Sequence, residues 1–198
     1  MTKKIIIVVI TILLLSTLYL SRVDNTITFE DKKFITDYFI KLEAGDPYKT
    51  SYEEQLNLIK SIQHSVFVVA PTQGGIDKRN TREPKDLYIK KTALCHDRSR
   101  VIEKILRYYG FKTRHISIYS TKNTGSIFKS LVTPGINSHA LSEVLTSKGW
   151  LVVDSNAEWL AIDKNSHPIS ISEIIKSKEV VTEKLLNNFP SFIYMEDF

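Results

Sequence analysis

The sequence predicts an α+β domain that follows an apolar N-terminal segment. Three observations indicate this: an amphipathic helix from Cys95 to Gly110, a pair of strands at 138–145 and 150–154, and an uncharged apolar run at 5–20. Helix and strand patterns that lie apart along the chain are typical of α+β proteins. At 198 residues the chain has room for one ordinary domain and its core.

The apolar run at 5–20 is slightly shorter than the roughly 17–25 residues that normally span a bilayer. Lys3 and Lys4 precede it, which favours an uncleaved signal anchor over residues 1–21. A cleaved signal peptide is the alternative, although Leu18–Ser21 offers a poor small-residue cleavage site. In either case the domain is expected on the extracytoplasmic side, periplasmic or outer.

We expect residues 22–49 to form a polar tether and a short helix, and residues 50–198 to form the domain. Apolar residues recur at helical spacing over 34–42, which predicts the short helix. A longer helix should begin after Ser51, because Ser51 and Glu54 have the spacing of a capping box.

The cysteine helix is predicted by a stripe of apolar residues with 3.6-residue spacing and by a glycine where a left-handed C-cap belongs. The stripe consists of Val101, Ile102, Ile105, Leu106 and Tyr109. The other expected elements are a polar loop at 71–92, a strand at 112–119, a second loop at 120–137, a helix capped by Ser172 and a tail, 184–198, docked on the core. The 71–92 loop carries several lysines and arginines, so it is either an electropositive rim for an anionic substrate or a solvated mobile loop.

Cys95 is the only cysteine in the chain, and it falls in the first turn of its helix. Unpaired backbone N–H groups and the positive end of the helix dipole favour a thiolate there. The helical spacing also puts Cys95 on the same side as the apolar stripe, which faces the body of the domain.

The strand pair supplies two further candidates, His139 and Asp154. If the hairpin closes so that Leu145 faces Lys148, Leu141 lies opposite Val152 and His139 lies opposite Asp154. The imidazole and the carboxylate are then within hydrogen-bond range. This register is an assumption, because a one-residue slip would break the pairing.

Cys95, His139 and Asp154 together have the chemistry of thiol acyl transfer: nucleophile, base and orienting acid. Their order, with the segments HALSEV and GWLVVD around the histidine and the aspartate, resembles the transglutaminase-like superfamily over about residues 50–160. The resemblance implies a papain-like domain in which a cysteine-headed helix packs on an antiparallel sheet bearing the histidine and the aspartate.

Two other residues are candidates for the site. His96 is a rival base, but its ring should point about 100° around the helix from its neighbour Cys95. Gln63 is a possible oxyanion donor, although a surface or interhelix role is favoured. With one cysteine and scattered histidines, the sequence predicts no metal site and no cofactor.

The sequence thus predicts an extracytoplasmic thiol hydrolase or acyl transferase that acts on amide bonds, peptide or isopeptide, through a Cys95 thioester. Its partners would be a peptide or envelope-polymer substrate and, through the N-terminal helix, a membrane. The basic residues form no arginine-rich run with aromatics, so we expect no nucleic acid. The alternatives are a non-catalytic envelope scaffold or ligand-binding module of the same fold and, more weakly, a redox-sensing thiol.

Overall fold

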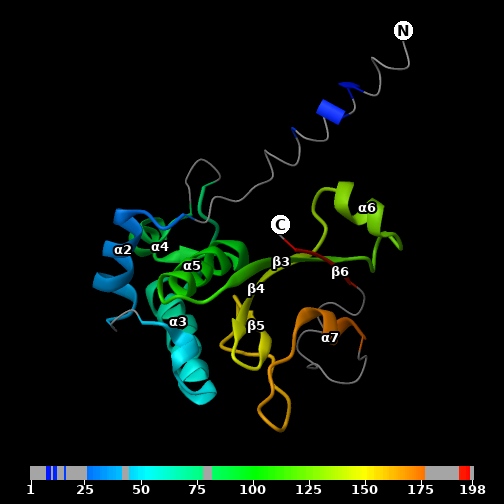
Figure 1. The fold of residues 1–198 in the computed structure, drawn as a ribbon. Helices are drawn as coiled ribbons and strands as arrows, with labels where there is room; N and C mark the ends of the chain where they lie inside the picture. The colour runs from blue at the N-terminus through cyan, green and yellow to red at the C-terminus, as the bar shows by residue number, and fades with distance from the viewer. Residues whose placement is uncertain are drawn as a thin grey trace.

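The computed structural model describes residues 8–9, 11–12, 16, 26–41, 45–77, 82–176 and 192–196. Over these residues the chain is α+β, which confirms the predicted class. Helices pack on both faces of an antiparallel sheet whose strands lie in the order β5-β4-β3-β6 (Figure 1).

The elements follow one another along the chain with these bounds. They are α2 (Phe29–Phe34), the π-helix η1 (Ile35–Phe39), the 3₁₀ helix η2 (Pro47–Lys49), α3 (Tyr52–Val69), β1 (Thr72–Gln73), α4 (Pro84–Lys90), β2 (Thr92–Ala93), α5 (Cys95–Tyr108), β3 (Thr113–Ser120), α6 (Ile127–Val132), β4 (Ser138–Thr146), β5 (Gly149–Asp154), α7 (Ile171–Lys176) and β6 (Phe192–Glu196).

The core lies on both faces of the sheet, because neighbouring residues of a strand point to opposite sides. On one face Val144, Leu151 and Val153 pack with the apolar stripes of α3 and α5. On the other face Leu141 and Val152 join β3 residues and pack against α7. Figure 1 shows α7 apart from α3 and α5, across the sheet.

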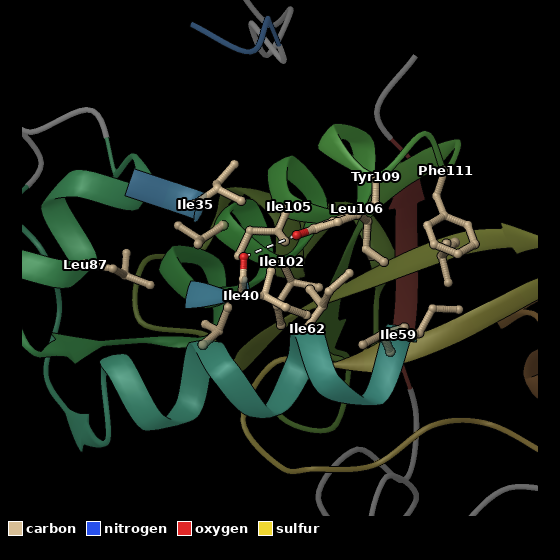
Figure 2. Close-up of a cluster of buried hydrophobic side chains, with 14 of the residues drawn as sticks. Ile35, Ile40, Ile59, Ile62, Leu87, Ile102, Ile105, Leu106, Tyr109 and Phe111 are labelled. Carbon is tan, nitrogen blue, oxygen red and sulfur yellow. Dashed lines mark hydrogen bonds between the residues drawn. The ribbon is translucent and has the colours of Figure 1, made fainter. Parts of the chain in front are cut away.

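The larger part of the core is centred on α5, which begins at Cys95 as predicted and ends at Tyr108, just before the predicted end. Ile102 and Ile105 are fully buried between α3 and the segment that precedes it (Figure 2). The Tyr109 hydroxyl donates a hydrogen bond to the Ile40 carbonyl at 3.2 Å, as the dashed line in Figure 2 shows. Gly110 follows with φ 88°, the left-handed conformation that a helix C-cap requires.

The described part of the segment before residue 50 packs onto the domain. Helix α2 begins at Phe29, earlier than predicted, and Ile35 is fully buried in the core. The Asp31 carboxylate is also buried, 2.8 Å from the Lys104 ammonium of α5. Buried ionic groups need such a partner, because desolvation is otherwise costly.

The predicted anchor, residues 1–21, lies largely outside the described residues. The described part consists of Val8, Val9, Thr11, Ile12 and Ser16, which are helical. Among the described residues no helix has the length and apolar character needed to cross a bilayer.

Both predicted long loops contain a short helix. Helix α4 lies within 71–92 and begins with Pro84 at its first turn, where proline is favoured. Helix α6 lies within 120–137. Helix α7 is capped by Ser170 and Glu173 rather than by Ser172, because these two side chains satisfy each other's backbone N–H groups. The described part of the tail, β6, pairs with β3.

Candidate functional site

The structure brings the three predicted side chains together from three separate elements. Cys95 is the first residue of α5, His139 lies at the start of β4, and Asp154 ends β5. His139 Nε2 lies 2.9 Å from Asp154 Oδ2, and the His139 ring also hydrogen-bonds with the Cys95 thiol. An imidazole has two ring nitrogens, so Nδ1 is left to meet the sulfur.

The predicted register of the hairpin is wrong by two residues. Thr146 pairs with Gly149, so the two-residue turn lies one residue further along the chain than expected, and Asp154 lies opposite Leu141 and not opposite His139. A shift of two preserves the faces of a strand, which repeat every second residue. His139 and Asp154 are therefore diagonal neighbours on one face, and a histidine side chain is long enough to reach across that diagonal.

Asp154 is held in place at its other oxygen and at its backbone. Its Oδ1 accepts hydrogen bonds from the N–H groups of Asn156 (2.6 Å) and Ala157 (2.8 Å). The Gln63 amide donates to the carbonyls of Asp154 (2.8 Å), Ala157 (3.1 Å) and Trp159 (2.9 Å). These contacts direct Oδ2 towards His139.

Gln63 is therefore a buried support of the site, not a surface or interhelix residue. It joins α3 to the loop that follows β5, across more than 90 residues of sequence. Its amide nitrogen is committed to backbone carbonyls, which leaves it unsuited to bind an oxyanion. Its position on the apolar stripe of α3 was the sequence signal that it is buried.

The Cys95 thiol is acidified by its neighbours. Burial raises the pKa of the thiol. Hydrogen bonds with His139 and His96 and from the Ala140 backbone lower the pKa by more than burial raises it, and the resulting pKa is about 6. A cysteine with that pKa is mostly thiolate at neutral pH, and the thiolate is the nucleophilic form.

The pKa of His139 is raised, whereas that of Cys95 is lowered. Burial lowers its pKa, yet the hydrogen bonds with Asp154 and Cys95 outweigh burial and raise the pKa to about 9. At neutral pH the pair is therefore a thiolate and an imidazolium, with the charge of Asp154 behind the ring. Such coupled groups titrate as a unit.

His96 also contacts the thiol, contrary to the expectation that its ring points about 100° around the helix from Cys95. Its ring hydrogen-bonds with Cys95, and its Nε2 lies 3.2 Å from Asp97 Oδ1. The 100° step applies to the Cα positions of a helix, whereas flexible side chains of adjacent residues in the first turn can still meet. The sulfur thus has two imidazole neighbours.

Arg98 was missed by the sequence analysis. It is fully buried one turn after the cysteine and ties three segments together. Its guanidinium donates to the Ala70 carbonyl (3.0 Å), to the Thr72 carbonyl (3.1 Å) and to Asn156 Oδ1 (3.0 Å). Asn156 lies in the turn that holds Asp154, so Arg98 connects the cysteine helix to that turn. An arginine usually indicates solvent exposure. The available sequence signal was position, because Arg98 precedes Val101 and Ile102 by three and four residues and therefore lies on the apolar stripe of the helix.

Two described basic residues of the 71–92 segment pair with acids of the domain. Arg82 Nε lies 2.9 Å from Asp97 Oδ1, and Lys85 Nζ lies 2.7 Å from Glu30 Oε1. Lys91 lies over the ring of Tyr88. The charges of Arg82 and Lys85 are therefore compensated by carboxylates, which weakens the idea of an electropositive rim at these two residues.

No protein-family model matches the sequence, and no curated protein matches it either. Among solved structures, the chain is similar to one described as the crystal structure of Rad4-Rad23 bound to a 6-4 photoproduct UV lesion. The TM-score is 0.41 and the identity 13%, over 85% of this chain and 41% of that chain. The chain thus spans less than half the length of that protein, and a similarity this weak carries no argument about fold or function.

Proposed function

We propose that this protein is a thiol hydrolase or acyl transferase of transglutaminase-like fold, acting on amide bonds through a thioester on Cys95. The observation that carries the proposal is the continuous hydrogen-bonded chain of Cys95, His139 and Asp154. A lone buried cysteine is usually inert, whereas a thiol with a lowered pKa beside an imidazole with a raised pKa is typical of nucleophilic catalysis.

In the acylation half of the reaction, the Cys95 thiolate attacks the carbonyl carbon of the amide. A C–S bond forms, and the carbonyl electron pair moves to the oxygen. The Cys95 N–H lies at the start of α5, where it has no acceptor within the helix, so it is available to stabilise this oxyanion. The intermediate then collapses: the C–N bond breaks, and the His139 imidazolium gives its proton to the leaving amine.

In the deacylation half, neutral His139 takes a proton from water, and the oxygen of that water attacks the thioester carbon. The C–S bond breaks, a carboxylic acid leaves, and the thiolate and the imidazolium are restored. An amine in place of water would give transfer. Hydrolysis is the favoured outcome, because water is always available outside the cell.

The proposal places the domain outside the cytoplasm, with the run at 5–20 as its membrane anchor and a peptide or an envelope polymer as its substrate. Sequence supports this part, through the two lysines that precede the apolar run. The fold assignment likewise depends on the resemblance of the segments around Cys95, His139 and Asp154.

The test is to trap the acyl-enzyme. The protein is incubated with cell-envelope extract, quenched in acid and digested, and the peptide containing Cys95 is read by mass spectrometry. We expect an added acyl mass on Cys95 that is absent in Cys95→Ala and strongly reduced in His139→Ala. A folded wild-type protein that never acquires this mass, and whose thiol titrates like free cysteine, would favour a non-catalytic scaffold.

A further inference from the structure

We propose that His96 is a second, fixed cationic partner of the Cys95 sulfur, which stabilises the thiolate both as nucleophile and as leaving group. The inference rests on the proposed function and assigns His96 a task that differs from that of His139. His139 moves protons, whereas His96 keeps its proton throughout the cycle.

The contacts of Asp97 fix the position of the His96 ring. The Asp97 side chain is fully buried, and its Oδ2 accepts hydrogen bonds from the N–H groups of Leu94 (2.9 Å) and Ile76 (3.2 Å). This leaves Oδ1 facing the His96 Nε2 at 3.2 Å and the Arg82 Nε at 2.9 Å. The carboxylate cannot rotate away without losing these two backbone hydrogen bonds, of which the one from Ile76 is buried.

The neighbours of the His96 ring favour its protonated form. A hydrogen bond with Asp97 and another with Cys95 raise its pKa to about 9, against the opposing effects of burial and of the Arg82 charge. The groups that face the ring are Asp97 and Cys95 from α5 and Arg82 from the segment before α4. The His96 side chain is 39% exposed, so replacing it opens no cavity in the core.

A second cation is useful because the charge of His139 changes during the cycle. His139 is neutral from the protonation of the leaving amine until it takes a proton from the attacking water, so it is a cation beside the sulfur for only part of the cycle. His96 donates no proton in the scheme, so it is still an imidazolium when the C–S bond breaks. Its charge therefore lowers the energy of the departing sulfur anion.

The experiment measures the rate of Cys95 alkylation by iodoacetamide between pH 4 and pH 10. The wild-type midpoint should lie at about 6, and His96→Ala should raise it by one to two pH units. A two-unit rise would leave about a tenth of the thiol ionised at pH 7, against about nine-tenths in the wild type, so alkylation should slow about tenfold. His167→Ala is the matched control, because His167 is another exposed histidine paired with an aspartate, Asp163, and should leave the midpoint unchanged.

Folding of each variant is checked by thermal melting. His96→Gln keeps side-chain volume and a hydrogen-bond donor but loses the charge, and it replaces the alanine variant if that one does not fold. It too should raise the midpoint, by at least half a unit.

The outcomes separate this inference from the proposed function. A midpoint that moves in His139→Ala but not in a folded His96 variant overturns the inference and leaves the proposed function standing. A wild-type midpoint near 8.5, the ordinary value for cysteine, overturns both, because neither imidazole then acts on the thiol.

Discussion

Replacing Asp154 with asparagine tests the physical basis of the site most directly. The carboxamide oxygen can still accept the two backbone hydrogen bonds from the turn that follows, so the local fold should survive. The NH₂ group would then face His139 Nε2, which now lies 2.9 Å from a carboxylate oxygen. The ring would lose both its acceptor and the negative charge that stabilises its protonated form.

The magnitude follows from the pKa of His139, which is raised from the model-peptide value of 6.5 to about 9. That difference corresponds to roughly 3 kcal/mol, shared between the effects of Asp154 and Cys95 with burial opposing both. Asp154 contributes the largest favourable effect, so we expect Asp154→Asn to lower the pKa of His139 by at least about one unit, or about 1.4 kcal/mol. Because the imidazolium in turn stabilises the thiolate, the pKa of Cys95 should rise. The pH range in which Cys95 is a thiolate and His139 an imidazolium should therefore become narrower, because its lower limit rises and its upper limit falls.

The assay combines an NMR titration of the His139 ring with the pH profile of Cys95 alkylation. Asp163→Asn is the matched control: Asp163 also caps its own turn, through the N–H groups of Asn165 and His167 at 2.8 Å, and pairs with a histidine, but in an exposed loop. A folded Asp154→Asn protein in which His139 titrates within half a unit of wild type would refute the reasoning.

The same substitution has a predictable pH dependence of stability. A histidine whose folded-state pKa is raised contributes stability that is fully present below its unfolded pKa, here 6.5, and is lost as pH rises through about 9. The destabilisation caused by Asp154→Asn, measured by denaturant unfolding, should therefore be larger at pH 6 than at pH 10. Equal destabilisation at the two pH values would mean that the pair adds nothing through protonation.

Two further substitutions test the supports of the site. Lys104→Met should lower the free energy of unfolding by about 3–5 kcal/mol, because it leaves the buried carboxylate of Asp31 and that of Glu83 without their shared cation. The control is Lys85→Met, which breaks an exposed ion pair with Glu30. It should cause no measurable loss of stability in denaturant unfolding. Gln63→Leu should lower the free energy of unfolding by about 2–4 kcal/mol, because the buried carbonyls around Asp154 lose their hydrogen-bond donor. The same variant should alkylate Cys95 more slowly at pH 7. An unchanged alkylation rate would show that Gln63 supports the fold alone.

The parts of the fold with local signals were predictable from sequence. The bounds of α5 follow from the spacing of its apolar stripe and from Gly110, and α3 follows from the Ser51 capping box. The hairpin was predicted with a register error of two residues, and the site survived that error because the error was even. A shift of one would have placed His139 and Asp154 on opposite faces of the sheet.

The missed features depend on contacts between residues far apart in sequence. Gln63 reaches a loop more than 90 residues away, and Arg98 joins α5 to segments 26 and 58 residues distant. Periodicity indicates that such a residue is buried or exposed, but not which carbonyl it meets. Helix α4 was missed for another reason: its charged residues read as a loop, although Glu83, Pro84 and Asp86 form a helix start.

The two imidazole–carboxylate pairs at the sulfur share one construction. Asp154 and Asp97 each accept two backbone N–H groups on one oxygen and face a histidine with the other. The two backbone N–H groups fix the rotation of each carboxylate, so each acid orients its histidine and stabilises the protonated form of that ring. Burial alone would keep Cys95 a neutral thiol. The reactivity that we propose is therefore set by the backbone geometry of two turns, one at the start of α5 and one after β5, rather than by the cysteine itself.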